Sequence, residues 1–288
     1  MKKSIYFLLA ALVLSFAACK DKNEPSDNTQ NDEPVNSNFV SKPFSVGASK
    51  TVYFSQGNLQ YRASTNRWRF APQQYARVGE YNSNISETSG YWIDLFGWGT
   101  SGYNGKFPYM ISLIDTDYGE GNNNIAGTNY DWGVYNPINN GGKQADLWRT
   151  LKRTEWDHLF NTRTDAAQLQ GQATVNGVQG YIILPDNWST PAGLTFTAVP
   201  KDWTTNTYDI DNWLLMEAAG AVFLPTDGYR RATKIFNIDD TGTYWTTARK
   251  GTHADSAYCV AFYKATAMKV YSVDRHRGFS VRLVQDVK

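Results

Sequence analysis

The stretch Thr243-Tyr-Trp-Thr-Thr-Ala248 carries the clearest structural signal in the chain. It is short, rich in β-branched and aromatic residues and flanked by polar turn residues, which is typical of a buried strand. Two stretches of the same kind follow, Ala257-Tyr-Cys-Val-Ala-Phe-Tyr263 and Phe279-Ser-Val-Arg-Leu-Val284. No helical pattern separates the three, so we expect them to be neighbours in an antiparallel sheet at the C-terminal end of the fold.

Working outward, other short apolar runs also read as strands. Alternating runs separated by turn residues such as Gln56-Gly57 predict antiparallel hairpins near the N-terminus. The runs are Phe44-Ser-Val46, Thr51-Val-Tyr-Phe-Ser55, Asn58-Leu-Gln-Tyr-Arg62, Arg67-Trp-Arg-Phe70, Val178-Gln-Gly-Tyr-Ile-Ile-Leu184 and Ala221-Val-Phe-Leu224.

Two helices are predicted among these strands. Thr154, with Asp157 three residues later, has the spacing of a capping box and is expected to begin a helix that ends near Phe160. Asp211 is expected to cap a second helix, which Gly220 ends. Few helices among many short strands predict an α+β fold built on antiparallel sheet.

Residues 79–146 are rich in Gly, Asn, Asp, Tyr and Trp but have neither helical nor strand periodicity. A loop region of this length is uncommon unless it is functional or held in place by packing. The aromatic residues are the candidates for holding it. We expect Trp92, Phe96, Trp98, Tyr130 and Trp132 to do so.

The N-terminus has the pattern of an export signal. Lys2 and Lys3 precede the apolar run Ile5-Tyr-Phe-Leu-Leu-Ala-Ala-Leu-Val-Leu14, which is too short to span a membrane, and small residues lead to Cys19. This end resembles the lipobox of bacterial lipoproteins, with Phe16 in place of the usual Leu. The resemblance implies cleavage before Cys19 and lipid attachment to its thiol, which would anchor the protein to a membrane.

The residues after Cys19 are polar and acidic, with one aliphatic side chain up to residue 38, so they cannot bury enough surface to fold. We therefore divide the chain into a signal peptide (1–18), a lipidated disordered tether (19–43), an N-terminal hairpin and aromatic loop region (44–146) and a second half (147–288). The last two are expected to form one continuous domain. The acidic start of the tether resembles export signals of Bacteroidota lipoproteins, which implies an outer-membrane lipoprotein exposed at the cell surface.

Charge and cysteine content exclude several function classes. Loss of Lys2 and Lys3 with the signal changes the formal net charge from +1 to −1, so no nucleic-acid partner is expected. Cys19 and Cys259 are the two cysteines of the chain, so lipidation of Cys19 leaves no disulfide. Cys259 lies within an apolar strand and is expected to be a core thiol.

The second half resembles a known family at several points in order. The segment Leu147-Trp-Arg-Thr-Leu-Lys-Arg-Thr-Glu-Trp-Asp-His-Leu159 is similar to the helix start of sulfatase-modifying-factor-like and C-type-lectin-like domains. Gly228-Tyr-Arg230, Tyr244-Trp-Thr-Thr247 and Arg277-Gly-Phe-Ser-Val-Arg-Leu-Val284 follow as in the Fibrobacter succinogenes major paralogous domain family. The resemblance implies a C-type-lectin-like fold, in which hairpins and two short helices display loops that bind glycans or proteins.

The enzymatic and metal-binding versions of this fold lack their residues here. The oxidases of the superfamily depend on cysteines that this chain does not have, and calcium-dependent lectins carry Glu-Pro-Asn or Gln-Pro-Asp. The Glu-Pro pairs of this chain, Glu24-Pro25 and Glu33-Pro34, lie in the tether without the Asn. His158, His253 and His276 have no metal-ligand spacing. We therefore expect no cofactor, no metal and no catalytic residue.

Two polar segments beside the C-terminal strands, 249–255 and 264–277, are dense in Arg, Lys, His, Tyr and Asp, which suit polar recognition around aromatic anchors. We expect both to form one binding surface, with the aromatic region 91–135 as the alternative site. The resemblance adds that related lectin-like proteins diversified by retroelements vary this segment. The candidate ligand-binding residues are Trp245, Arg249, Lys250, His253, Asp255, Tyr271, Asp274, Arg275 and His276.

The leading hypothesis is a lipid-anchored, non-enzymatic surface protein that binds an extracellular glycan or protein ligand. Two alternatives stay open: a hydrolase or other enzyme acting on glycans or peptides, and a structural component of the cell envelope. Saturable binding without turnover would favour the first hypothesis, turnover the second, and neither the third.

Overall fold

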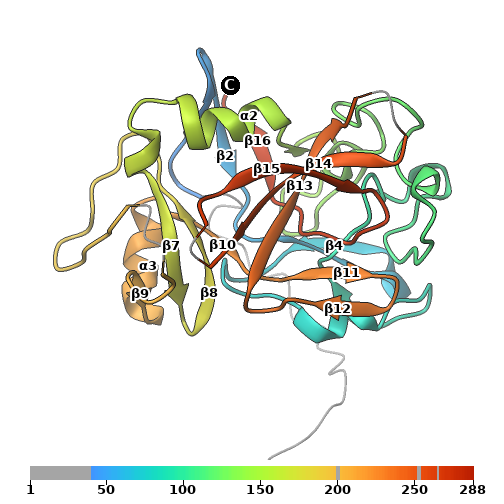
Figure 1. Cartoon of the computed structure of the whole chain (residues 1–288), viewed down its shortest axis with the longest axis horizontal. Coiled ribbons are helices and arrows are strands. Elements are labelled where there is room, and N and C mark those ends of the chain that lie inside the picture. The colour runs from blue at the N-terminus through green and yellow to red at the C-terminus, as the bar shows by residue number, and fades with distance from the viewer. Residues whose placement is uncertain (1–39, 199–201, 252–253, 265) are drawn as a thin grey trace, which may run out of the picture.

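The computed structural model describes residues 40–198, 202–251, 254–264 and 266–288 (Figure 1). Within these residues, small sheets and a few short helices make up the regular structure, as the expected α+β class requires. In Figure 1 the β7–β8 pair and α3 lie at the left, β4 and the β11–β12 hairpin at the right, and β13, β14 and β15 between them.

One sheet joins the two ends of the described chain. Its strand order is β1 (Phe44–Gly47), β2 (Lys50–Phe54), β16 (Leu283–Asp286) and β6 (Arg149–Thr150), all antiparallel. The C-terminal strand therefore lies inside the sheet, between two strands from earlier in the chain. The hairpin of β1 and β2 agrees with the alternation in the sequence.

Residues 279–281, expected to belong to the last strand, instead cross between sheets. The N–H of Phe279 donates to the carbonyl of Phe96, and the N–H of Leu59 donates to that of Val281, both at 2.9 Å. Ser280 exchanges hydrogen bonds with the β13 backbone, accepting from Trp245 at 3.0 Å. Strand β16 begins only at Leu283 because these earlier residues pair with several partners in turn.

A C-terminal antiparallel sheet exists and consists of β13 (Thr241–Arg249), β14 (Ser256–Tyr263) and β15 (Lys269–Asp274). The expectation that residues 279–284 are its third strand is wrong, because β15 takes that place. Strands β13 and β14 were predicted, but β15 lies within a segment that was expected to be a loop, and that expectation is wrong. Val270 packs on one hydrophobic cluster while Tyr271 and Val273 pack on another, so both faces of β15 are partly covered. A strand covered on both faces lacks the alternation that marks a half-buried strand.

Two further sheets and a hairpin complete the strands. The second hairpin predicted near the N-terminus, of β3 and β4, belongs to a sheet of order β4-β3-β5, and a fourth sheet has the order β10-β8-β7-β9. Strands β11 and β12 form a two-stranded hairpin, and Arg230 of β11 also forms an antiparallel bridge with Gly278. The bounds are β3 Leu59–Arg62, β4 Arg67–Phe70, β5 Trp92–Ile93, β7 Gln170–Val175, β8 Val178–Ile183, β9 Thr207–Tyr208, β10 Val222–Pro225, β11 Tyr229–Arg231 and β12 Lys234–Phe236.

Both predicted helices exist, but their caps differ from the prediction. In α2 (Arg153–Asp157) Lys152 is the N-cap, and its N–H donates to the Glu155 carboxylate at 2.8 Å, so Thr154 lies inside the helix. The chain continues as a π-helical turn, His158–Thr162. In α3 (Ile210–Ala218) the cap is Asp209, whose carboxylate accepts from the N–H of Asn212 at 2.9 Å.

Glycine ends α3 as expected, because Gly220 has a φ of +105°, a value that L side chains rarely adopt. A short helix, α1 (Trp132–Tyr135), was not predicted. Its N-cap is Asp131, whose carboxylate accepts from the N–H of Gly133 at 3.4 Å. With four residues it is too short to produce a helical periodicity in the sequence.

The aromatic region 79–146 is held by its own side chains, as predicted. Phe96, Trp98, Tyr130 and Trp132 are buried in one hydrophobic cluster that also contains residues of β3, β13 and β14. Gly119 passes so close to Trp98 that an added Cβ would lie 2.3 Å from the indole ring. Trp92 is the exception and was wrongly assigned, because its side chain is half-buried on the outer side of β5.

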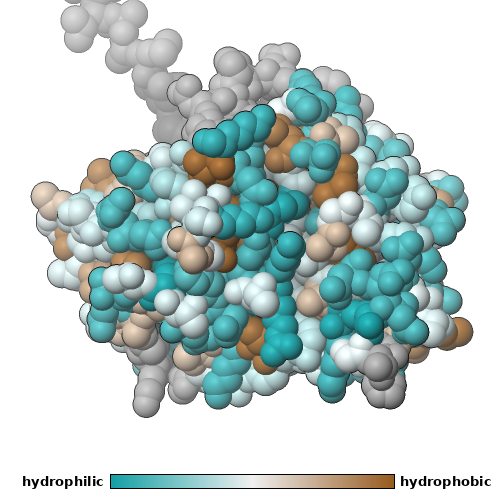
Figure 2. Space-filling model, turned by 90° about the horizontal axis from the view of Figure 1, so that it is seen from above, coloured by the Kyte–Doolittle hydropathy of each residue, from teal (hydrophilic) through white to brown (hydrophobic). Residues whose placement is uncertain are grey.

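Cys259 is buried in β14, as predicted for a core thiol. Burial raises the pKa of its thiol to about 12, so the group stays protonated at neutral pH and is a poor nucleophile. Seen from the side of α2, the surface is mainly hydrophilic, with small and separate apolar patches (Figure 2). No helix in the described ranges is long and apolar enough to cross a membrane.

Candidate functional site

Trp245, a candidate ligand contact, is a core residue. Its side chain is 1% exposed, and its indole N–H donates to the carbonyl of Phe96 at 2.7 Å. Its ring packs on that of Phe279, with 4.5 Å between the centroids. The expectation that Trp245 contacts a ligand is therefore wrong, since strand β13 directs this side chain into the aromatic cluster.

Arg275 is also buried, and the expectation that it is a surface contact is wrong. Its guanidinium donates to the carbonyl oxygens of Gly121 at 2.7 Å and of Tyr118 at 3.4 Å. It lies 4.5 Å from the ring centroid of Trp98. Burial lowers the pKa of Arg275 to about 10, which leaves the group charged at neutral pH. This side chain binds the loop at 118–121 rather than an external ligand.

His276 likewise serves the structure. Its Nδ1 lies 2.8 Å from a carboxylate oxygen of Asp115, which also accepts from the backbone N–H of His276 at 3.0 Å. The side chain is buried, so the expectation that it contacts a ligand is wrong. Together with Arg275 it joins the end of β15 to residues 115–121.

The two polar segments do not form one surface. Residues 249–255 connect β13 to β14, and the end of β15 returns to them, since the N–H of Arg275 donates to the carbonyl of Asp255 at 3.1 Å. Residues 264–268 connect β14 to β15 at the opposite end of the sheet. The expectation of a single surface is therefore wrong for this second connection.

The remaining candidates are scattered over this sheet. Lys250 and Asp255 are exposed near the β13–β14 connection, and Arg249 and Asp274 are half-buried there. Tyr271 lies in the middle of β15, opposite Cys259, and packs against the aromatic cluster. His253 lies outside the described residues. None of these described residues lines any of the three cavities that are considered below or lie beside β6.

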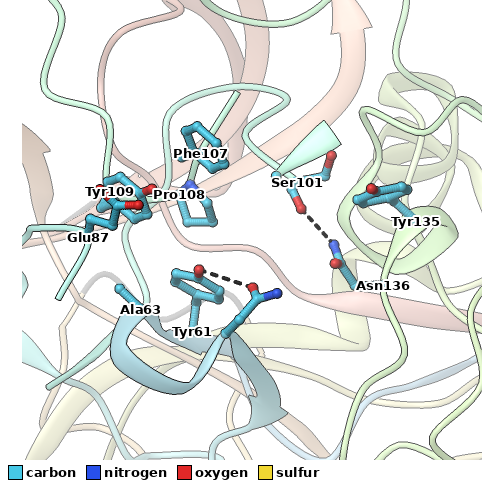
Figure 3. A pocket seen from close by; sticks show the side chains of 11 residues that line it. Tyr61, Ala63, Glu87, Ser101, Phe107, Pro108, Tyr109, Tyr135 and Asn136 are labelled. Atoms are coloured by element: carbon cyan, nitrogen blue, oxygen red, sulfur yellow. Dashed lines mark hydrogen bonds between the residues drawn. The ribbon is translucent and has the colours of Figure 1, made fainter. Parts of the chain in front are cut away.

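A better-formed site lies in the aromatic region that the sequence offered as the alternative. Here a cavity of about 270 Å³ opens between β3, the loop at 84–91, residues 101–109 and the end of α1 (Figure 3). In Figure 3, Glu87, Phe107 and Tyr109 lie on one side of the cavity and Ser101, Tyr135 and Asn136 on the other. The lining residues are Tyr61, Ala63, Asn66, Glu87, Ser101, Gly102, Phe107, Pro108, Tyr109, Tyr135 and Asn136. We refer to it below as the aromatic cleft.

Exposed aromatic rings form the walls of the aromatic cleft. The rings of Phe107 and Tyr109 stack, with centroids 5.2 Å apart and planes 3° from parallel. Across the cavity, Tyr135 packs edge-on against Tyr103. Phe107 and Tyr135 remain 42% and 40% exposed, which is unusual for rings that could pack inward. These rings are fixed by neighbouring rings and still offer apolar faces to a ligand.

Polar groups are placed between the rings. The Tyr61 hydroxyl donates to Asn66 Oδ1 at 3.1 Å, and the amide of Asn136 donates to the Ser101 carbonyl at 2.9 Å. Burial, together with the nearby Tyr109 and Glu87, raises the pKa of Tyr61 to about 12. Burial and Glu87 also raise the pKa of Tyr109. Both phenols are therefore neutral at physiological pH and can donate or accept hydrogen bonds.

The residues that line the aromatic cleft suit the binding of a ligand. Of the residues that line it, Glu87 is the one carboxylate, whereas glycoside hydrolysis commonly uses a pair of carboxylates. No described group of three or more His, Cys, Asp and Glu side chains is arranged to hold a metal ion. Apolar ring faces beside amide, phenol and carboxylate groups suit a ligand that is itself both ring-shaped and polar.

The aromatic cleft is assembled from parts of the chain that are far apart in sequence. Asn66 reaches Tyr61 because it sits in a left-handed turn, with φ +47°, at the end of the 3₁₀ turn Ala63–Thr65. The 101–109 segment is held by a hydrogen bond of 2.6 Å from the Ser101 hydroxyl to the carbonyl of Asn129. The signal available in the sequence was the aromatic and glycine-rich composition without periodicity.

Comparisons of the chain with known protein families, with characterised proteins and with solved structures found no match.

Proposed function

We propose that this chain is a lipid-anchored, non-enzymatic surface protein that binds an extracellular glycan in the aromatic cleft. The observation that carries the proposal is the pairing of exposed, mutually packed rings with polar side chains across one cavity. Flat aromatic faces pack on the C–H faces of sugar rings, and amides, phenols and carboxylates bind sugar hydroxyls. The proposal thus keeps the ligand class expected from the sequence and moves the site.

A C-type-lectin-like fold is part of this proposal. Short hairpins, two main short helices and a sheet that joins both ends of the described chain are consistent with it. Retroelement diversification of the C-terminal segment is not part of it, because Trp245, Arg275 and His276 are buried. A segment that varies freely needs exposed positions, since changes at buried ones destabilise the fold.

Removing one ring of the aromatic cleft is expected to weaken glycan binding by about tenfold or more. Tyr109→Ala removes a stacking face and a hydroxyl, and burial of an aromatic side chain stabilises by about 1.5–3 kcal/mol. The measurement is a glycan array with the purified full-length protein, followed by calorimetric titration of the best ligand. Tyr263→Ala is the matched control, because this 42% exposed tyrosine lies at the far end of β14. We expect its affinity to equal that of the wild type.

Three outcomes would contradict the proposal. If the wild-type protein binds no glycan on the array, the ligand is not a glycan of the classes tested. Equal loss of affinity in the Tyr109 and Tyr263 variants shows that the site is not the aromatic cleft. Cleavage of a bound glycan shows that the protein is an enzyme.

Lipidation is tested separately. Cys19→Ala is expected to move the protein from the membrane fraction to the soluble fraction, since the thiol is the proposed attachment point for the lipid. The measurement is fractionation of cells fed a labelled fatty acid. Cys259→Ala is the control, because that thiol is buried and should leave both label and location unchanged. Unlabelled wild-type protein, or a Cys19 variant that stays in the membrane, would refute the anchor.

A further inference from the structure

Three arginines share the outward face of the β4–β3–β5 sheet. In the β3–β4 ladder Gln60 pairs with Arg69 and Arg62 with Arg67, so these four side chains lie on one face. Trp92 of β5 joins this face, opposite Arg62. The other face carries Leu59, Tyr61, Trp68 and Phe70, which belong to the aromatic cluster. The sheet therefore separates the protein core from a concentrated positive charge.

Among the described residues, these arginines have no acidic partner. Neither Arg62, Arg67 nor Arg69 forms an ion pair with a carboxylate of the described residues. The guanidinium groups of Arg62 and Arg69 lie 4.5 and 3.8 Å from the centroid of the Trp92 ring. Burial and the charge of Arg62 lower the pKa of Arg69 to about 10. Two positive charges on one ring repel each other, and a bound anion would relieve that repulsion.

A hollow of about 310 Å³ opens beside these charges, lined by Gln60, Arg69, Arg77, Tyr81, Tyr91 and Trp92, among others. Tyr81 and Tyr91 stack at its rim, with centroids 5.7 Å apart and planes 11° from parallel. They are 51% and 40% exposed. Arg77 is neutralised by Asp239, so the uncompensated charge comes from the arginines of the sheet. The site thus offers a cation and an apolar platform side by side.

We propose that this face is a second binding site, for an acidic glycan whose sugar rings carry sulfate or carboxylate groups. The planar guanidinium fork binds sulfate and carboxylate with two parallel hydrogen bonds, and the stacked tyrosines take the apolar face of a sugar ring. Single-stranded nucleic acid is the less suitable ligand, because it requires a basic groove along its backbone and the formal charge of the chain is only +1.

The second site does not depend on the aromatic cleft. Tyr61 and Arg62 are consecutive on β3 and therefore point to opposite faces, the first into the aromatic cleft and the second to the arginine face. The loop at 84–91 lies between the two sites, giving Glu87 to one and Tyr91 to the other. Variants on each face can therefore be tested separately.

The test measures binding of the purified full-length protein to heparin, polygalacturonate, neutral dextran and a single-stranded DNA oligomer at physiological salt. We expect binding to heparin, to polygalacturonate or to both, which distinguishes sulfate from carboxylate, and none to dextran. The triple variant Arg62→Gln, Arg67→Gln, Arg69→Gln should lose affinity at least tenfold. The matched control is Arg231→Gln, Lys234→Gln, Lys269→Gln, which removes the same charge from exposed positions on other strands and should bind like the wild type.

Further variants separate folding and the first site from this one. Tyr81→Ala leaves the arginines intact and should also weaken binding of the acidic polymer, whereas Tyr109→Ala should leave it unchanged. The proposal is overturned if the wild type binds neither acidic polymer, if both triple variants lose affinity equally, or if the DNA oligomer binds more tightly than the polysaccharides. If Tyr109→Ala bound neutral glycans as tightly as the wild type does, only the proposal for the aromatic cleft would be contradicted.

Discussion

Arg275→Ala is expected to lower the free energy of unfolding by about 2–4 kcal/mol. The substitution removes a fully buried cation that donates to the carbonyl oxygens of Tyr118 and Gly121 and packs on the Trp98 ring. Hydrogen bonds to charged groups contribute about 1.5–3 kcal/mol, and a desolvated cation–π contact about 2 kcal/mol. Part of this gain is offset in the native protein by the cost of burying the charge, which keeps the expected loss within that range.

The measurement is urea unfolding of the variant beside the wild type. Arg277→Ala is a control of the same chemistry two residues away, where the side chain is half-buried and its contact with Asp274 is 3.3 Å long. Its unfolding free energy should change by no more than about 0.5 kcal/mol. An Arg275 variant as stable as the Arg277 variant would place the Arg275 side chain in solvent, where the sequence alone had suggested it.

The second large effect concerns a buried pair of carboxyl groups, Asp94 and Asp227. Asp94 accepts from the Val78 N–H at 2.8 Å and from the Asn82 amide at 2.7 Å. Asp227 Oδ1 has no hydrogen-bond partner among the described residues, and Asp227 Oδ2 accepts from the Ser280 hydroxyl at 3.5 Å. The carboxyl groups of Asp227 and Asp94 interact electrostatically. Burial first, and then the charge of Asp94, raise the pKa of Asp227 well above its usual value. Asp227 therefore keeps its proton and donates it to the Asp94 carboxylate.

This proton makes stability fall as pH rises. Above pH of about 4 an unfolded aspartate is ionised, whereas the folded pair retains one proton. The unfolding free energy should then decrease by up to about 1.4 kcal/mol per pH unit until the folded pKa of Asp227 is reached. In Asp227→Asn an amide N–H takes the place of the carboxyl O–H as hydrogen-bond donor, and the amide does not titrate. We expect this variant to match the wild type near pH 4 and to be more stable than the wild type at pH 7, because the folded pKa of Asp227 is raised.

Asp94→Asn is the matched control, because its single amide oxygen can accept from only one of the two donors, Val78 N–H and the Asn82 amide, and its own N–H would face the other. That variant should be destabilised at every pH. The measurement is thermal and urea unfolding of all three proteins between pH 4 and 8. Parallel pH profiles for the wild type and Asp227→Asn would mean that no proton is held between the two aspartates.

How far the sequence predicted this structure depends on how local each signal is. Strands β13 and β14, the core position of Cys259 and the end of α3 at Gly220 follow from patterns within a few residues. The observed helix caps lie two residues before the predicted ones. For α3, Asp209 and Asp211 both fit the sequence pattern of a cap, and only the backbone geometry selects Asp209. Strand β15 was missed because its two faces meet different clusters, which removes the alternation.

The candidate site was harder to predict because it depends on contacts between residues that are far apart in the sequence. Polar residues at 249–277 read as a surface, but the partners that bury Arg275 lie near residues 98 and 120, far away in sequence. Composition cannot show that an arginine has a tryptophan to stack on. The aromatic cleft likewise brings together four segments between residues 61 and 136, so only its aromatic character was visible in the sequence.

The position of β16 affects the order in which the strands of its sheet can pair during folding. Residues 283–286 follow β2 and β6 by more than a hundred residues, yet they lie between these two strands and pair with both. Until these residues are available, β2 presents an unpaired edge, which is a template for pairing with other chains. Removal of residues 283–286 would therefore open the centre of a sheet, whereas removal of an edge strand would leave the other strands paired.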